Sequence, residues 1–185
     1  MALLPVHAVG CMYKQVESPE ARPRNAQEQR IISDFKKRVD HYEDVSERVQ
    51  KRTYPVTSDV RPAEIHKRQQ AMADGVIKAL PGWKQGAIFT PEIADFFRAR
   101  LKEVFAGPDG ASIKAAIEDD DPGEIGLKVM AQYPTGAPVT TVPLQMLKVL
   151  PALPKEVEYR FLGGNLILMD EAAFLIIDFI PNAYK

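Results

Sequence analysis

Histidines close to carboxylates are the residues in this chain that could perform acid–base chemistry. His41 follows Asp40 and lies two residues before Glu43, and His66 lies two residues after Glu64. Imidazole titrates near neutral pH, so either histidine paired with a carboxylate could act as a general base or bind a metal. Both lie in segments predicted to be amphipathic helices. The interpretation that this pattern favours is a position on a solvated helix face.

A run of acidic residues offers oxygen ligands for a cation. It comprises Glu118, Asp119, Asp120, Asp121 and Glu124. Calcium takes carboxylate oxygens, but the spacing of a calcium loop, with its central glycine and terminal glutamate, is missing. The run therefore fits a solvated helix end better than a metal site.

Two further segments could bind a ligand. Ser112 lies near a predicted helix start, where free N–H groups and a hydroxyl can bind an anion, although helix capping accounts for the same residue. Trp83 and Phe89 flank Lys84 and Gln85 in a predicted loop. They could form an aromatic recognition edge, and packing against neighbouring helices is the favoured alternative.

The chain lacks the local motifs that mark common catalytic classes. It contains no Gly-x-Ser-x-Gly, no glycine-rich phosphate loop, no His-Glu-x-x-His and no dinucleotide-binding fingerprint. Its single cysteine, Cys11, excludes an internal disulfide framework and a cysteine-rich zinc site. The sequence therefore predicts no catalytic, cofactor-binding or metal-binding residue.

Composition and charge exclude two classes of partner. The 185 residues are 45% hydrophobic, enough for one domain with its own core. Lys and Arg number 24 against 25 Asp and Glu, so no overall field draws the chain to nucleic acid. No apolar run approaches the roughly 18 to 20 residues that a membrane helix requires. We expect no nucleic-acid partner and no transmembrane segment.

Apolar residues at spacings of three and four predict helices in the first two thirds of the chain. The predicted helices cover residues 26–52, 62–80 and 91–105, with Thr90 as a cap of the third, and a shorter helix begins at Asp109. A further short helical segment starts at Pro143.

The C-terminal run from Leu150 to Ile180 predicts a β-meander. Its strands are expected at 157–162, 166–169 and 174–179, with a tight turn at Gly163–Asn165. The second and third strands are apolar on both faces, which indicates cover on both sides. An alternating segment at 127–133 is expected to join the same sheet. Helices first and strands last predict an α+β fold, with N-terminal amphipathic helices packed on a small antiparallel sheet.

The N-terminus is expected to be a leader and linker over residues 1–25, followed by a single α+β domain over 26–185. Residues 1–10 are apolar apart from His7, and small residues lead into Cys11. This resembles the end of a bacterial lipoprotein signal, in which the cysteine is lipidated. It departs from that pattern in its short apolar stretch and its lack of a basic start. A disordered N-terminus is the alternative.

The C-terminal third carries a longer pattern, LPxLPxExEYRFxGxxLxLxDxxAxLIxDFIPxA, from Leu150 to Ala183. It resembles the signature of an uncharacterised bacterial family whose members are typically predicted to be exported. The similarity extends upstream through 85–91, the following helix and 107–117, and more loosely to 35–42. The family has no known activity, so the resemblance implies no catalytic residues. It implies export, which makes lipidation of Cys11 plausible.

Two hypotheses of function follow. The leading one is a non-enzymatic cell-envelope module, periplasmic or anchored to the outer membrane by a lipid on Cys11, that binds a protein or an envelope component. The alternative is a small, hydrolase-like enzyme, with a cytoplasmic location as the alternative to export. A pocket that holds His41 or His66 against a carboxylate of shifted pKa would favour the enzyme. An exposed apolar patch or an unpaired sheet edge would favour the binding module.

Overall fold

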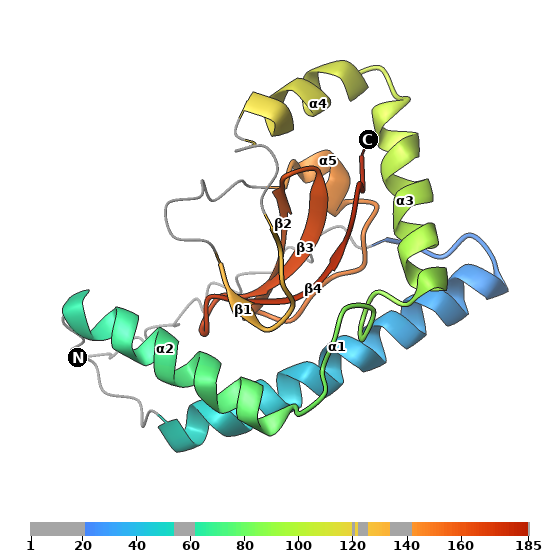
Figure 1. The fold of residues 1–185 in the computed structure, drawn as a ribbon. Coiled ribbons are helices and arrows are strands. Elements are labelled where there is room, and N and C mark those ends of the chain that lie inside the picture. Colours follow the sequence, from blue (N-terminus) through green and yellow to red (C-terminus); the bar gives the residue numbers. More distant parts are fainter. Residues whose placement is uncertain (1–20, 54–61, 120, 122–125, 134–141, 185) are drawn as a thin grey trace, which may run out of the picture.

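The computed structural model describes residues 21–53, 62–119, 121, 126–133 and 142–184. The elements are α1 (Ala26–Thr53), α2 (Pro62–Ala79), α3 (Pro91–Phe105), α4 (Gly110–Asp119), β1 (Ala131–Gln132), α5 (Leu144–Leu147), β2 (Val157–Leu162), β3 (Asn165–Asp170) and β4 (Leu175–Ile180). The helices surround a central antiparallel sheet (Figure 1), so the predicted α+β class is confirmed. No helix in the described ranges has both the length and the apolar character needed to cross a bilayer.

The helices form where the apolar stripes predicted them. The buried side of α1 repeats at spacings of three and four, from Ile31 to Val49. Helix α2 packs on α1 so closely that a Cβ on Gly75 would lie 2.5 Å from Cγ1 of Val49. Helix α3 begins as predicted, because the side chain of Thr90 accepts a hydrogen bond from the N–H of Ile93 at 3.4 Å.

The sheet has the strand order β1-β4-β3-β2, which places β3 and β4 in the centre and β2 at one edge. Gly163 and Gly164 form the turn between β2 and β3 with φ of 59° and 82°. This left-handed geometry is the one that a two-residue hairpin requires, and it sets Leu162 opposite Asn165. The predicted turn is confirmed.

Two predicted strands begin too early. The segment predicted at 127–133 forms a strand only at Ala131–Gln132, and β4 starts at Leu175 instead of Phe174. The residues before these strands, Met130 and Phe174, have φ of 59° and 52°. Left-handed backbone at a non-glycine residue breaks an extended strand, and a pattern of apolar residues does not reveal it.

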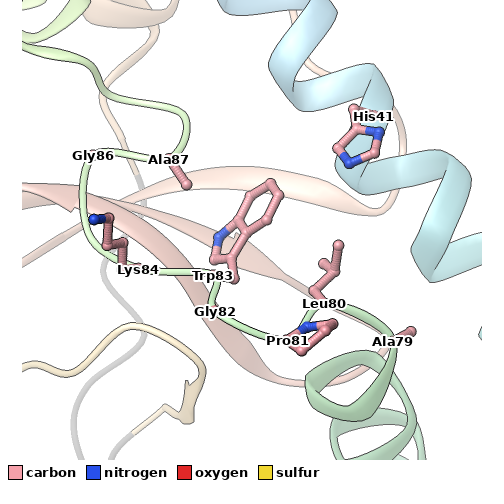
Figure 2. Close-up of a pocket in the computed structure, with 9 residues that line it drawn as sticks. All are labelled: His41, Ala79, Leu80, Pro81, Gly82, Trp83, Lys84, Gly86 and Ala87. Carbon is pink, nitrogen blue, oxygen red and sulfur yellow. The ribbon is translucent and has the colours of Figure 1, made fainter.

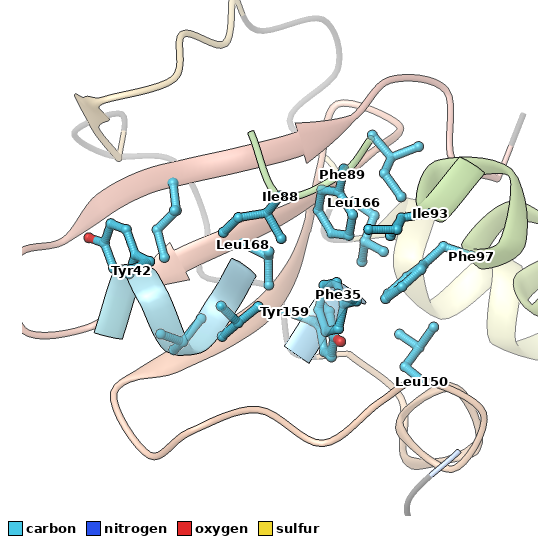
Figure 3. Packing of buried hydrophobic residues seen from close by; sticks show 14 of the residues in the cluster. Phe35, Tyr42, Ile88, Phe89, Ile93, Phe97, Leu150, Tyr159, Leu166 and Leu168 are labelled. Atoms are coloured by element: carbon cyan, nitrogen blue, oxygen red, sulfur yellow. The ribbon is translucent and has the colours of Figure 1, made fainter. Parts of the chain in front are cut away.

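Aromatic side chains fill the space between the sheet and the helices (Figure 3). The ring of Phe35 on α1 lies 5.0 Å from Phe97 on α3 and 6.4 Å from Tyr159 on β2. Pairs of this kind stabilise by about 0.5 to 1.5 kcal/mol beyond their burial. On the other face, Ile167 and Met169 of β3 lie in a second cluster, so the prediction that this strand is covered on both sides is confirmed.

The chain is attached to the helices before α1 begins. The N–H of Ala21 donates to the carbonyl of Leu150 at 3.2 Å, and Ala21 is buried. Arg24 pairs with Glu103 of α3 at 2.7 Å. The segment over 21–25 therefore lies against α3 and against the chain that follows α5.

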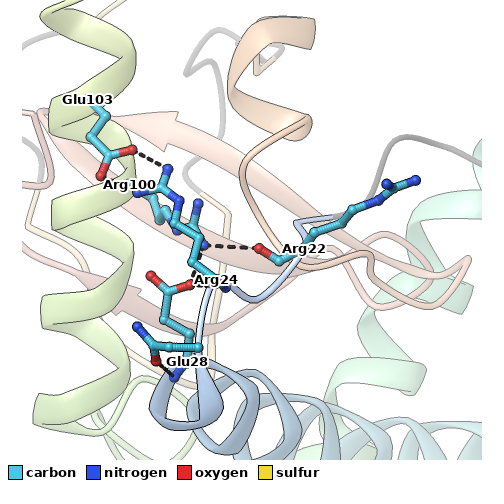
Figure 4. A network of polar contacts seen from close by, with 6 residues as sticks. Arg22, Arg24, Glu28, Arg100 and Glu103 are labelled. Atoms are coloured by element: carbon cyan, nitrogen blue, oxygen red, sulfur yellow. Dashed lines mark hydrogen bonds and ion pairs between the residues drawn. The ribbon is translucent and has the colours of Figure 1, made fainter.

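A buried arginine completes this attachment (Figure 4). Arg100 of α3 donates to the carbonyl of Arg22 at 3.1 Å and to the carboxylate of Glu28 at 2.7 Å. Its guanidinium also lies 5.2 Å from the centre of the Phe96 ring. A buried cation needs such partners, so this contact fixes the start of α1 on α3.

The close approach of α4 to α3 gives a first prediction. A Cβ on Gly110 would lie 1.8 Å from the carbonyl oxygen of Phe105, whereas a Cβ on Gly126 would meet nothing within 4 Å. We expect Gly110→Ala to lower the free energy of unfolding by at least about 1 to 3 kcal/mol, because α4 must move away from α3. Gly126→Ala is the matched control. Urea titration followed by circular dichroism measures both, and equal midpoints would contradict the expectation.

Candidate functional site

The hollow around His41 does not have the composition of an acid–base site (Figure 2). It has a volume of about 340 Å³ and lies between α1 and residues 79–87. None of the described residues that line it carries a carboxylate. His41 itself lies beside Trp83, with ring centroids 6.3 Å apart. His66 is exposed on α2.

The predicted loop with Trp83 and Phe89 packs inward. The indole N–H of Trp83 donates to the carbonyl of Ile177 at 3.0 Å, and its ring lies 5.7 Å from Tyr42. That carbonyl belongs to an extra residue in β4, because the register shifts between the pairs Leu168–Asp178 and Met169–Ile176. Phe89 is buried. Of the two interpretations, packing is the one that the structure supports.

Asp178, next to this bulge, binds the same loop. Its carboxylate accepts the N–H groups of Gly86, Ile88 and Phe89 at 3.0, 2.8 and 2.8 Å. Burial raises the pKa of Asp178, and the donated N–H groups oppose that rise. The loop between α2 and α3 is thus fixed to β4 by one side chain.

Asp170 at the end of β3 has an equivalent role toward α1. It accepts the hydroxyl of Tyr42 at 2.9 Å, the hydroxyl of Ser46 at 2.7 Å and the N–H of Ala173 at 2.9 Å. Burial, followed by the charge of Asp170, raises the pKa of Tyr42 well above its ordinary value. All three side chains are buried, so the cluster supports the fold and presents no reactive group to solvent.

Two described acids of the run at the end of α4 contact other protein groups. Asp121 accepts the N–H of Gly163 at 2.8 Å and the hydroxyl of Tyr184 at 2.7 Å. Glu118 lies 3.7 Å from Lys114, one helical turn away. Within the part of the chain that the structure describes, no three His, Cys, Asp or Glu side chains are placed to hold a metal ion.

Other predicted residues have local roles or lie outside the described ranges. The hydroxyl of Ser112 donates to the carbonyl of Asp109 at 2.8 Å at the start of α4, whereas a capping hydroxyl would accept a backbone N–H. Cys11, Asp120 and Glu124 lie outside the described residues.

A groove at the edge of the sheet was not predicted from the sequence. Its volume is about 400 Å³, and it lies between β2 and the segment that contains α5. The lining residues are Val142, Leu144, Leu147, Pro151, Ala152, Leu153, Val157, Glu158, Tyr159 and Arg160. Four consecutive residues of β2 line it although their side chains alternate between the two faces, so the groove follows the edge of the strand.

The wall formed by α5 is apolar and exposed. Leu144 and Leu147 have 57% and 39% of their surface accessible. The core side of α5 is occupied by Met146, which is fully buried. The two leucines therefore face the groove and solvent without contributing to the core.

The other wall carries charge. The Nε of Arg160 donates to the carboxylate of Glu158 at 2.6 Å, and a guanidinium nitrogen lies 3.8 Å from Glu171. Burial raises the pKa of Glu158. Of these side chains only Glu158 and Arg160 line the groove, and their formal charges cancel.

No family model, curated protein or solved structure matches the chain. The geometry of the groove and its surroundings is therefore the basis for a functional proposal.

The anchoring role of Asp178 gives a second prediction. Asn in its place would turn an NH₂ group toward the backbone N–H donors, leaving at least one of them unpaired. We expect Asp178→Asn to lower the free energy of unfolding by about 1 to 3 kcal/mol. The fluorescence of Trp83, the only tryptophan, should also change, because its indole N–H bonds to the carbonyl of Ile177, the residue before Asp178. The exposed Asp95→Asn is the control. Unchanged fluorescence and stability in Asp178→Asn would show that the carboxylate does not hold the loop.

Proposed function

We propose that this protein is a non-enzymatic binding module of the cell envelope, which holds a segment of a partner protein in the groove between β2 and α5. The observation that carries the proposal is an edge strand, β2, to which no further strand pairs among the described residues, bordered by two exposed leucines. Such an edge is a ready surface for another chain, and natural proteins usually protect it with charge or cover it. An apolar wall beside this edge favours binding of another chain, because an edge that is protected from pairing usually carries charge.

The dimensions of the groove support a peptide segment as the occupant. A volume of about 400 Å³ falls within the range of ligand sites, and it accommodates a few side chains instead of a broad protein surface. One wall carries the ion pair of Glu158 and Arg160, whereas the opposite wall is apolar. This combination suits a segment that alternates in polarity.

Export is the second part of the proposal. It rests on the likeness of the sequence before Cys11 to the end of a lipoprotein signal, and on the family resemblance, which implies export. Residues 12–20 would connect such an anchor to Ala21, which is bound to Leu150. Leu150 immediately precedes Pro151 of the groove, so the groove would lie close to the end of the tether.

Intact mass and cell fractionation test the export proposal. Expressed with its natural upstream sequence in a Gram-negative host, the product should carry a diacylglyceryl or triacyl adduct on Cys11 and sediment with membranes. Cys11→Ser should abolish the adduct and release the protein. An unmodified protein in the cytoplasm would overturn the envelope location and leave the groove to be tested by itself.

Replacement of the exposed leucines tests the groove. A photo-crosslinking residue at Ala152 should capture a partner in cells, and Leu144→Ser with Leu147→Ser should reduce the yield at least about tenfold, since a buried leucine contributes roughly 1.5 to 3 kcal/mol. The matched control is Ile65→Ser with Ile77→Ser, two comparably exposed residues of α2. Both double variants should keep the melting temperature of the parent. Equal crosslinking in the two would contradict the proposed role of the groove.

A further inference from the structure

We propose that the groove between α1 and the end of α2 binds a phosphate monoester, with its phosphoryl group held by Arg48 and Arg52 and its organic part beside Trp83. This site is formed by other elements than the groove between β2 and α5, and it goes beyond the function proposed above. The inference follows from two adjoining hollows, from the bases that line them and from the charge that those bases leave uncompensated.

Two hollows lie along the same side of α1. The first is the one around His41, which extends over residues 79–87. The second has a volume of about 240 Å³ and lies between α1 and α2. It is lined by Val45, Arg48, Val49, Arg52 and Ala79. Because Ala79 lines both, the two hollows adjoin and form one groove.

Helix periodicity gathers bases on this side of α1. His41, Val45, Arg48 and Arg52 follow one another at spacings of four, three and four, so they lie on one face of the helix. The acidic side chains of the same stretch line neither hollow. They are Asp40, Glu43, Asp44 and Glu47. Among the residues that the structure describes, every ionisable side chain that lines the groove is therefore a base.

The two guanidinium groups are not neutralised by the protein. The Nε of Arg48 donates to the backbone carbonyl of Asp44 at 3.0 Å, which orients the group. Within the described ranges, its terminal nitrogens and the whole guanidinium of Arg52 have no hydrogen-bond or ion-pair partner. Lys51 on the same turn is paired with Glu47 at 2.7 Å. Arg48 and Arg52 thus present two positive charges at the hollow that they line.

Charge and geometry favour a phosphoryl group as the anion. A phosphate monoester carries about −1.5 to −2 charges near pH 7, so one group can neutralise both arginines, which a single carboxylate cannot do. Side chains one helical turn apart have Cβ atoms about 5–6 Å from each other, close enough to contact the same group. The planar fork of guanidinium donors also matches the oxygens of a phosphate.

The adjoining hollow has room for the organic part of such a ligand. Its volume is about 340 Å³, and the half-buried ring of Trp83 lines it (Figure 2). The indole N–H is already bonded to Ile177, so the ring offers its apolar surface to a ligand. Lys84 and His41 line the same hollow, and a cationic Lys84 adds to the attraction for an anion.

Titration of the full-length chain with phenyl phosphate tests this site, with calorimetry and the fluorescence of Trp83, the only tryptophan, as readouts. Arg48→Gln with Arg52→Gln should weaken binding at least about tenfold, because charge-assisted hydrogen bonds are lost. The matched control is Arg30→Gln with Lys37→Gln, which removes the same charge from exposed positions of α1 outside the groove.

A second variant separates binding from stability. Cations near the C-terminal end of a helix also stabilise it, so the Gln variant could lose binding by loosening α1. Arg48→Lys with Arg52→Lys keeps that charge and should keep the melting temperature of the parent. Because lysine lacks the planar fork, this variant should bind phenyl phosphate with an affinity between those of the parent and the Gln variant.

Matched anions test the choice of ligand. Phenyl sulfate resembles phenyl phosphate in shape but carries a single charge, and it should bind at least about threefold more weakly. Inorganic phosphate should displace phenyl phosphate without itself changing the fluorescence of Trp83. Vesicles of phosphatidic acid present the same phosphoryl group on a lipid. Sedimentation with them that requires the two arginines would identify a lipid headgroup as its source, and its absence would identify a soluble ester.

The outcomes are independent of those for the groove between β2 and α5. Absence of saturable binding, or equal affinities in the two Gln double variants, would overturn the site. Equal binding of phenyl sulfate and phenyl phosphate would overturn the choice of a phosphoryl group. Leu144→Ser with Leu147→Ser should bind phenyl phosphate as the parent does, so failure of either proposal is distinguished from failure of the other.

Discussion

Two buried carboxylates attach the helical layer to the sheet, and the remaining geometry depends on them. Asp170 on β3 binds Tyr42 and Ser46 of α1, and Asp178 on β4 binds the loop that leads into α3. A buried carboxylate without donors costs several kcal/mol, so any movement of α1 or of this loop away from the sheet is resisted. The position of the helices relative to the central strands is thus fixed by polar contacts within an otherwise apolar core.

This arrangement leaves β2 at the edge of the sheet, with no further strand paired to it in the described ranges. The anchors belong to the central strands, whereas β2 is held by its pairing with β3 and by Tyr159, which packs on Phe35 and bonds to Pro151. Both walls of the groove are therefore connected to the same rigid frame. A groove that exists before binding spares the partner the cost of ordering it, which suits recognition of an extended segment.

Periodic patterns in the sequence made many of the helices and strands predictable. Contacts between segments that are distant in the sequence could not be predicted. The stripes of α1 and α3, the cap at Thr90 and the glycine turn after β2 are local, and the structure confirms them. The left-handed residues Met130 and Phe174 left no trace in the pattern of apolar residues. Asp178 is visible as a single acid within an apolar strand, a signal of a buried anchor, whereas Asp170 is followed by Glu171 and gives no such signal. The partners of Asp170 on α1 lie more than 120 residues away and could not be identified. The groove joins two segments whose proximity is a property of the tertiary structure alone.

The family-like signature from Leu150 to Ala183 includes the residues that support the sheet and excludes the two exposed leucines of the groove. Tyr159, Gly163, Asp170 and Asp178 all belong to the signature, and each has a structural role in the sheet or its attachment. Leu144 and Leu147 precede it. The signature therefore describes the frame, and the apolar wall lies outside it. Exposed residues that contribute little to the core can change without loss of stability. Pairing through the backbone does not depend on side chains, whereas contact with the wall formed by α5 does. A chain with the same signature and other residues at positions 144 and 147 would therefore keep the edge strand and bind a different segment.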